Sequence, residues 1–225
     1  MRTPYARLVA KTLAITPSGA LSPGPLSAAG VAAGAMLGPL GGVAVALGHT
    51  LFELPYVALL TRWASRVRGA LTGGWGRLLL AVMAGFTWFF SAGLAELAVA
   101  SWRGAVSIAG PGRGGPLSPD SLAGAVVVGV LYTGANPYFL AWWATTGFPL
   151  LEEASRLRAG LPVMYASHVW MDYAWLALLA AGGVAAGRTG QHAYAALMAA
   201  LSLVLAYYAL RFTLLALRPG AAGRA

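Results

Sequence analysis

Two histidines in this chain are each followed, four positions later, by a carboxylic acid. His49 precedes Glu53, and His168 precedes Asp172. In a helix, residues i and i+4 lie on one face with Cβ atoms about 5–6 Å apart. Each pair can therefore share a proton or a bound ion between its two side chains.

The chemistry of these four side chains allows two interpretations. Histidine titrates near neutral pH and suits a proton carrier, and the carboxylates can pair with an ammonium group or carry a coupling proton. Imidazole and carboxylate groups are also ligands for a borderline divalent metal. The chain has no cysteine, which excludes disulfides and thiolate sites. No metal is expected in the leading interpretation, and an alternative metal site would use His49, Glu53, His168 and Asp172.

The histidine pattern belongs to a longer repeat. A proline break precedes each copy, and Pro23 and Pro137 are 114 positions apart while the two histidines are 119 apart. This spacing predicts a half-chain unit that is used twice within a single transmembrane domain, residues 1–225. Repeat one covers about 1–105, an outer linker about 106–120, and repeat two about 121–220.

The composition indicates a membrane protein. Of 225 residues, 59% are hydrophobic and only 9% are charged, whereas soluble domains have about 25% charged residues. The net charge of +9 comes from basic residues at the ends of apolar stretches, which is the pattern of membrane topology and not of a nucleic-acid surface. We therefore expect a lipid bilayer around the chain, and no nucleic-acid partner and no cofactor.

Six stretches are long and apolar enough to cross a bilayer, which takes about 20 residues. They lie near 8–36, 40–61, 77–100, 121–145, 161–182 and 191–216. With these spans, twelve Lys and Arg residues fall on one side and three on the other. Basic loops are cytoplasmic, so the sequence predicts a multi-pass protein of the plasma membrane with both termini in the cytoplasm.

The number of spans in each half fixes the relation between the halves. Three spans per half is odd, so the second half enters the bilayer upside down relative to the first. The predicted fold is an all-α polytopic membrane protein, with six transmembrane helices arranged as two inverted three-helix repeats. Many secondary transporters are built in this way, with the substrate site near the midplane between the repeats.

The proline-rich segments predict breaks in the first and fourth spans. Proline removes a backbone donor and clashes with the preceding helical turn, and irregular backbone in a membrane is tolerated where it lines a cavity. A simple kink is the alternative. The predicted breaks lie at Pro23, Pro25 and Pro137, and the solute- or ion-binding candidates beside them are Ser22, Gly24 and Asn136.

Other polar and aromatic residues receive more ordinary interpretations. Trp142 and Trp143 are expected to anchor the chain at the cytoplasmic interface, where aromatic residues are enriched. Residues 151–158 are expected to form a short surface helix in a cytoplasmic connection. Glu96 is a third carboxylate inside a span, and it has either a functional role or simply reaches the outer interface.

The break motifs resemble those of the LysE/RhtB amino-acid exporter family. The resemblance rests on residues 21–25 (Leu-Ser-Pro-Gly-Pro) opening the first span and on Asn136-Pro137 in the fourth. The two histidine–acid elements look like a branch of that family common in archaea. The resemblance covers essentially the whole chain and implies export of amino acids or related small solutes from the cytoplasm, driven by an ion gradient.

The leading hypothesis is a secondary exporter, not an enzyme, that exchanges a zwitterionic solute for protons or another coupling ion. A possible homo-oligomer is compatible with the sequence. A divalent metal cation exporter is the main alternative. An intramembrane metalloprotease using Glu152 and Glu153 is less favoured, because the chain has no His-Glu-x-x-His motif. A membrane protein with a purely structural role is equally disfavoured.

Overall fold

The computed structural model describes residues 3–22, 24–63, 76–105 and 119–217, and within these ranges every regular element is a helix. This confirms the predicted all-α class. The helices are α1 (Pro4–Ile15), α2 (Pro17–Ala20), α3 (Pro25–Leu37), α4 (Pro39–Arg62), α6 (Gly76–Trp102), α7 (Leu122–Gly134), α8 (Pro137–Ala144), α9 (Phe148–Ser155), α10 (Gly160–Thr189) and α11 (Gln191–Leu217).

The membrane spans agree with the predicted six. Four helices are each long and apolar enough to cross a bilayer alone, namely α4, α6, α10 and α11. The other two spans are bent pairs: α1–α2 with α3, at 77°, and α7 with α8, at 59°. Counting each bent pair as one span gives up to six crossings, and spans one and four are the broken ones, as expected. The chain is therefore a polytopic membrane protein.

The prolines act as helix starts within the two bent spans. Pro25 begins α3 and Pro137 begins α8, and the first turn of a helix is where a missing N–H costs least. Asn136 caps α8, its Oδ1 accepting hydrogen bonds from the backbone N–H groups of Tyr138, at 3.0 Å, and Phe139, at 3.4 Å. Pro23 lies outside the described residues. Each break therefore separates two complete helices.

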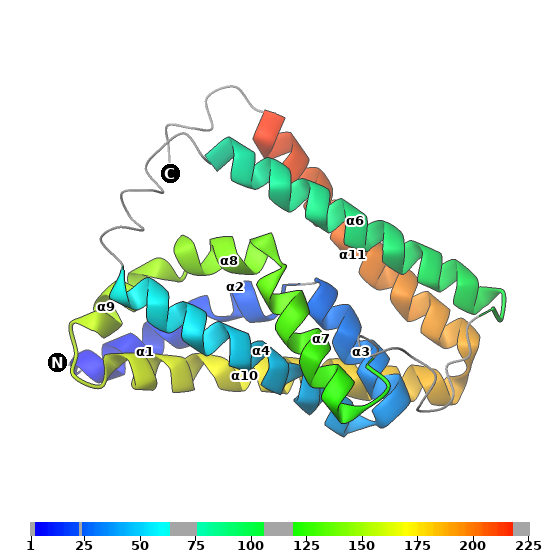
Figure 1. Ribbon diagram of the computed structural model, residues 1–225, viewed down its shortest axis with the longest axis horizontal. Coiled ribbons are helices and arrows are strands. Elements are labelled where there is room, and N and C mark those ends of the chain that lie inside the picture. The colour runs from blue at the N-terminus through cyan, green and yellow to red at the C-terminus, as the bar shows by residue number, and fades with distance from the viewer. Residues whose placement is uncertain (1–2, 23, 64–75, 106–118, 218–225) are drawn as a thin grey trace.

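The helices form a central body and a pair that packs against it (Figure 1). In the body, α4 and α10 run side by side, with α3 and α7 toward one end and α1, α8 and α9 toward the other. The remaining helices, α6 and α11, pack against each other along their length. Reciprocal bonds join this pair: Ser91 Oγ donates to the Ser202 carbonyl at 2.9 Å, and Ser202 Oγ donates to the Ser91 carbonyl at 2.8 Å.

Glycines permit close contacts between helices in the body. Gly48 of α4 faces Gly129 of α7, and Gly34 of α3 lies against the backbone of Ala180 in α10. Inside a bilayer the hydrophobic effect does not drive helices together. Small residues stabilise helix contacts there because they let the backbones approach closely. Gly42 of α4 lies against the Leu176 carbonyl of α10 in the same way, so the two helices that carry the histidine–acid pairs are in close contact.

Two predictions concerned α8 and α9: the interface anchors in α8 were wrong, and the short surface helix was confirmed with shifted bounds. Trp142 and Trp143 are 6% and 0% exposed and belong to a core cluster with Leu151, so they are not interface anchors. The predicted surface helix at 151–158 begins earlier, as α9, and one face of it is buried in the same cluster. A tryptophan at the membrane interface needs a surface that faces lipid, whereas Ser18 and Gly19 of α2 lie against Trp142 here and Trp143 bonds to Glu53 of α4.

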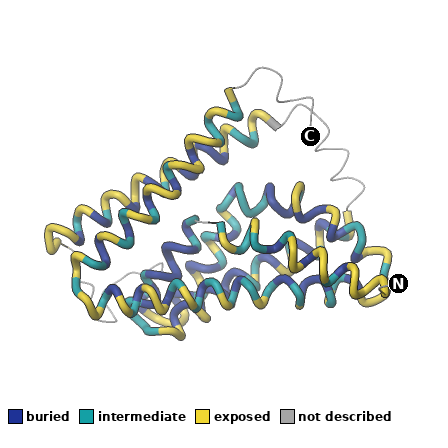
Figure 2. The backbone as a smooth tube through the Cα atoms, turned by 180° about the vertical axis from the view of Figure 1, so that it is seen from behind, coloured by how far each residue is buried: buried dark blue, intermediate teal, exposed yellow. Residues whose placement is uncertain are grey.

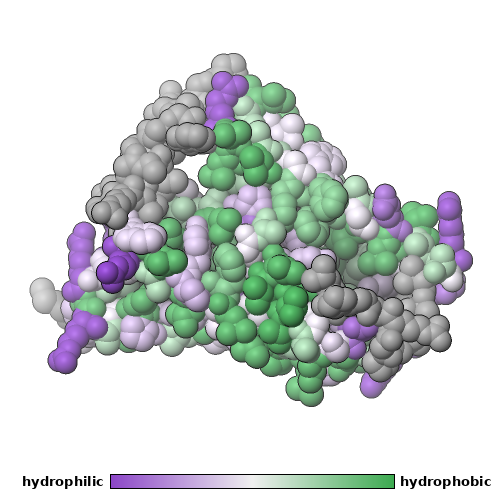
Figure 3. All heavy atoms as spheres, in the orientation of Figure 1, coloured by the Kyte–Doolittle hydropathy of each residue, from purple (hydrophilic) through white to green (hydrophobic). Residues whose placement is uncertain are grey.

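The outer surface suits a hydrocarbon environment. Figure 2 shows buried residues concentrated where the helices of the body meet, with exposed residues along the outward faces. Many exposed side chains are large and apolar, among them Leu40, Phe89 and Leu203, which are 63%, 72% and 72% exposed. In Figure 3, hydrophobic residues gather over the middle of the visible face, and hydrophilic ones lie mainly toward its edges. Such a surface is stable in lipid and costly in water.

Candidate functional site

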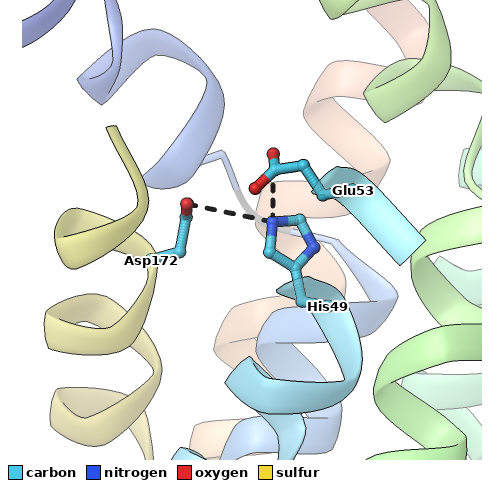
Figure 4. Close-up of side chains that lie close together, drawn as sticks. All are labelled: His49, Glu53 and Asp172. Carbon is cyan, nitrogen blue, oxygen red and sulfur yellow. Dashed lines mark ion pairs between the residues drawn. The ribbon is translucent and has the colours of Figure 1, made fainter. Parts of the chain in front are cut away.

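The two histidine–acid pairs meet between α4 and α10. His49 and Glu53 extend from α4, and His168 and Asp172 from α10; all four are at most 5% exposed. Figure 4 shows His49, Glu53 and Asp172 pointing toward one another. Residues more than a hundred positions apart thus form one buried cluster, which we call the His–acid cluster: His49, Glu53, His168 and Asp172.

The imidazole nitrogens and carboxylate oxygens alternate around the cluster. His49 Nε2 lies 3.3 Å from Glu53 Oε1 and 3.9 Å from Asp172 Oδ2. His168 Nε2 lies 3.2 Å from the same Glu53 oxygen and 3.3 Å from the same Asp172 oxygen. Each nitrogen therefore sits between two acids that come from different helices. A cation, whether protons or a metal ion, is needed to stabilise two carboxylates that are this deeply buried.

Glu53 is held by two further donors that the sequence analysis did not identify as functional. Trp143 Nε1 donates to Glu53 Oε1 at 2.9 Å, and the Tyr165 hydroxyl donates to Glu53 Oε2 at 3.0 Å. Such bonds stabilise the ionised carboxylate and fix its orientation. Tyr165 lies three positions before His168, one helical turn away, and that spacing was the only sequence signal for it.

Threonines orient both histidines, and these residues were also missed. Thr133 Oγ1 lies 2.9 Å from His49 Nδ1, and Thr16 Oγ1 lies 2.9 Å from His168 Nδ1. The single hydroxyl hydrogen of Thr133 is donated to the Gly129 carbonyl at 2.7 Å. Its oxygen can therefore only accept from His49, so Nδ1 of His49 carries a hydrogen. In the neutral ring, Nε2 then presents its lone pair to the two acids.

The threonine contacts cross between the predicted repeats. Thr16 of the first span holds the histidine of the fifth, and Thr133 of the fourth span holds the histidine of the second. The same relation thus occurs twice, with the halves exchanged, as expected if a repeated unit packs against its own copy. The sequence could not reveal it, because each threonine contacts the opposite half.

A cavity adjoins the cluster and reaches both helix breaks. Its volume is about 50 Å³, room for a few waters at roughly 10–15 Å³ each. Ser22, Gly24 and Asn136 line it, together with all four cluster residues. The structure thus brings the seven predicted solute- or ion-binding residues to one cavity. The two breaks meet there, since a Cβ built on Gly24 would lie 3.7 Å from Asn136 Nδ2.

Within the part of the chain that the structure describes, two polar atoms in the lining of this cavity are buried without a hydrogen-bond partner. They are Asp172 Oδ2, an acceptor, and Trp175 Nε1, a donor, one helical turn apart on α10. Leaving such groups unpaired costs about 1–3 kcal/mol each. The start of α3 adds further donor capacity, because its cap, Gly24, has no side chain to bond the first N–H groups. The cavity therefore offers donors near the break and, at the cluster, a carboxylate oxygen that pairs with the two histidines but accepts no hydrogen bond among the described residues.

Two more cavities continue toward the α6–α11 pair. One shares Ser22, Gly24, Asn136 and Tyr138 with the first cavity and is bounded by Phe86, Leu205, Tyr208 and other residues of α6 and α11. The other, of about 480 Å³, is lined by residues of α3, α6 and α7, including the exposed carboxylate Glu96. Glu96 thus lies apart from the His–acid cluster.

A helical membrane protein with broken spans, a buried ionisable cluster and a cavity at the breaks has the organisation of a transporter. The comparison with protein families matches residues 17–215 to the LysE type translocator family. The chain belongs to this family, as its break motifs indicated, and it is therefore a translocator of the membrane and not a member of an enzyme family. The searches of curated proteins and of solved structures gave no match.

Proposed function

We propose that this translocator exports a small zwitterionic solute, such as an amino acid, from the cytoplasm in exchange for protons. The observation that carries the proposal is a pair of buried atoms in the cavity that make no hydrogen bond among the described residues, Asp172 Oδ2 and Trp175 Nε1. The Asp172 oxygen has only the ion-pair contacts with the two histidines, at 3.3 and 3.9 Å. An ammonium group would satisfy the acceptor, and a carboxylate would satisfy the donor. A zwitterion supplies both groups in one small molecule.

The helix break supports the carboxylate end of this binding mode. The N-terminus of a helix carries partial positive charge and free N–H groups, which favour an anion. At α3 these groups have no side-chain cap, whereas at α8 the carbonyl oxygen of Asn136 uses two of them. The Asn136 amide nitrogen faces Gly24 across the cavity. The start of α3, Asn136 and Trp175 would together hold the solute carboxylate.

The His–acid cluster would supply the coupling. Its two acids and two imidazoles exchange protons among neighbouring atoms at 3.2–3.9 Å. A solute ammonium arriving at Asp172 would replace a proton there, because both are cations that stabilise the same carboxylate. Release of the solute on the outer side would let a proton bind again. Competition for one carboxylate is sufficient to link the two fluxes in opposite directions.

Passage of a solute requires the helices around the cavity to separate, because about 50 Å³ holds waters and not an amino acid. The adjoining cavities lead along the breaks toward α6 and α11, and this pair is bonded within itself through Ser91 and Ser202. Movement of α6 and α11 as one unit would widen the route while α4 and α10 keep the cluster in place.

Transport by the purified full chain in proteoliposomes tests the proposal. Vesicles are given an imposed pH gradient and a panel of radiolabelled amino acids, with protein-free vesicles as the control. We expect at least one zwitterionic solute to move against its gradient, with counterflow of protons followed by a pH-sensitive dye. Failure of every solute in a broad panel would remove the substrate assignment, and movement insensitive to the pH gradient would remove the proton coupling.

A further inference from the structure

We propose that the His–acid cluster is also a binding site for one divalent transition-metal ion of the zinc class. His49, Glu53 and Asp172 would supply three ligand atoms. His168, whose Nε2 lies 3.2 Å from Glu53 Oε1 and 3.3 Å from Asp172 Oδ2, would supply the fourth after a shift of its side chain. This goes beyond the proposed function, because metal binding is measured without any solute and either proposal can hold without the other.

The spacing of the ligand atoms supports a metal ion. One ligand atom from each of His49, Glu53 and Asp172 lies within 4.8 Å of the other two. The nitrogen–oxygen separations around the whole cluster are 3.2, 3.3, 3.3 and 3.9 Å. Four ligands at bonds of about 2.0–2.1 Å in a tetrahedral zinc site lie about 3.3–3.4 Å apart. Three of these four nitrogen–oxygen separations are thus close to those of a metal site, although His168 lies outside the group whose ligand atoms are all within 4.8 Å of one another.

The chemical types of the ligands select the class of metal. Imidazole and carboxylate together suit zinc and its borderline neighbours, whereas magnesium and calcium take oxygen ligands almost alone. The chain contains no cysteine, so a soft thiolate site is excluded. The third histidine, His192, is exposed at the start of α11 and contacts Trp102. It is outside the cluster.

The threonine contacts give the site the outer partners typical of metal-binding histidines. A ligating imidazole usually bonds through its other nitrogen to a fixed acceptor, which sets the tautomer and aims the ligating atom. The acceptor for His49 is Thr133, whose own hydrogen is committed to the Gly129 carbonyl. His49 Nε2 is therefore presented as a lone pair toward Glu53 and Asp172, as metal binding requires.

The burial of Asp172 supports a metal ion independently of the ligand spacing. Its side chain is only 7% exposed. Its Oδ2 has no hydrogen-bond donor among the described residues, although it faces the cavity and both histidines. A buried oxygen with free lone pairs, next to a second carboxylate, gains most from a doubly charged ion.

Metal binding to the purified full chain in detergent, measured by isothermal titration calorimetry, tests the proposal. We expect one zinc ion per chain, with proton release seen as a dependence of the heat on the ionisation enthalpy of the buffer. Magnesium at the same concentration should not bind. Cobalt(II) titration gives a second signal, because tetrahedral cobalt absorbs visible light strongly and octahedral cobalt weakly.

Matched variants locate the site. His49→Gln and His168→Gln should each weaken zinc binding by about 100-fold or more, and Thr133→Val by about 10- to 100-fold, the range for outer-shell partners. His192→Gln should leave zinc affinity unchanged. Thr12→Val is the control for threonine, because Thr12 is equally buried and its hydroxyl bonds only the Leu8 carbonyl of its own helix.

Zinc affinity that is the same in His49→Gln, His168→Gln and wild type would overturn the proposal, as would loss of binding in His192→Gln alone. An octahedral cobalt spectrum in the wild type would do the same. Should a histidine variant fail to fold, judged by gel filtration and circular dichroism, the pair Thr133→Val and Thr12→Val decides. Equal zinc affinities in those two variants count against the site.

Discussion

Gly183 of α10 lies directly against Val31 of α3: a Cβ added to Gly183 would come within 2.9 Å of the Val31 carbonyl carbon and 3.0 Å of the Ala35 nitrogen. Backbone atoms cannot move aside as a flexible side chain can. The neighbouring residue, Gly182, has no atom within 4 Å of the same added carbon. These adjacent glycines therefore differ only in how tightly their surroundings pack. The contact at Gly183 helps to position α10, which carries half of the His–acid cluster.

Gly183→Ala should lower stability by about 1–2 kcal/mol, because overpacking costs more than the gain in helix propensity returns. Gly182→Ala should be neutral or slightly stabilising. Thermal unfolding of both variants in detergent, followed by circular dichroism, measures the difference. Equal melting temperatures would mean that α3 and α10 are not in such close contact.

Trp175→Phe should raise the KM for a carboxylate-bearing solute by roughly 5- to 10-fold, as expected for losing one hydrogen bond worth about 1–1.4 kcal/mol. Phenylalanine retains an aromatic ring and removes the unpartnered Nε1. Trp170→Phe is the control, because Trp170 is 52% exposed on the same helix. Uptake kinetics in proteoliposomes compare the two. An unchanged KM in Trp175→Phe would place the carboxylate elsewhere.

His168→Gln should abolish the acceleration of export by a pH gradient, reducing the driven rate to about a tenth or less, equivalent to ~1.4 kcal/mol or more. Glutamine can still contact Thr16 but cannot titrate, so the cluster loses one proton carrier. His192→Gln should behave as wild type, because His192 lies at the far end of α11 from the cluster. The measurement is export with and without the gradient. Retained coupling in His168→Gln would assign proton transfer to other groups.

The contact between α1 and α9 should depend on pH. The Glu153 carboxylate lies 2.5 Å from Lys11 Nζ and 2.8 Å from Arg7 Nε; the hydrogen bond from Lys11, with that from Arg7, lowers the Glu153 pKa. Because the Glu153 pKa is lower in the folded than in the unfolded state, the two ion pairs stabilise the fold at pH values above the unfolded-state pKa. That stabilisation is lost as the pH falls through the folded-state pKa. Because the contact is at the surface, it contributes about 0–1 kcal/mol and weakens with salt.

Glu153→Gln tests that contribution. The variant should melt below wild type at pH 7 and low salt. The difference should begin to shrink as the pH falls through about 4, the ordinary range for Glu, and should vanish below the lowered pKa of Glu153 in the folded state. The difference should also shrink in 0.5 M salt, roughly the ionic strength at which screening is nearly complete. A gap in melting temperature that persists in acid would assign the effect to packing.

Both termini are predicted to be cytoplasmic, and the absence of native cysteine makes this simple to test. Ser155→Cys, at the end of α9, should react with a membrane-impermeant maleimide only after the cells are opened. Ala105→Cys, just after α6, should react in intact cells. Both positions are exposed, so a failure to label reports sidedness. The reverse pattern of labelling would invert the topology.

The sequence by itself determined the class of fold and most of the site. Low charge density, six apolar stretches and proline breaks specify a helical membrane chain with interrupted first and fourth spans, because these depend on local composition and local backbone chemistry. The i, i+4 spacing also fixed which pairs face the same way: His49 with Glu53, and His168 with Asp172.

Only the tertiary structure decided which groups surround those pairs. The threonines that orient the imidazoles come from the opposite half of the chain, and Trp143, which sequence position alone assigned to the membrane interface, donates to Glu53 instead. Such contacts depend on how closely helices approach, and this is set by glycines such as Gly48 and Gly129 packing against each other's backbone. Contacts between segments a hundred residues apart produce no periodic pattern in the sequence. The local pattern could therefore indicate the four residues of the His–acid cluster but not the residues that surround them.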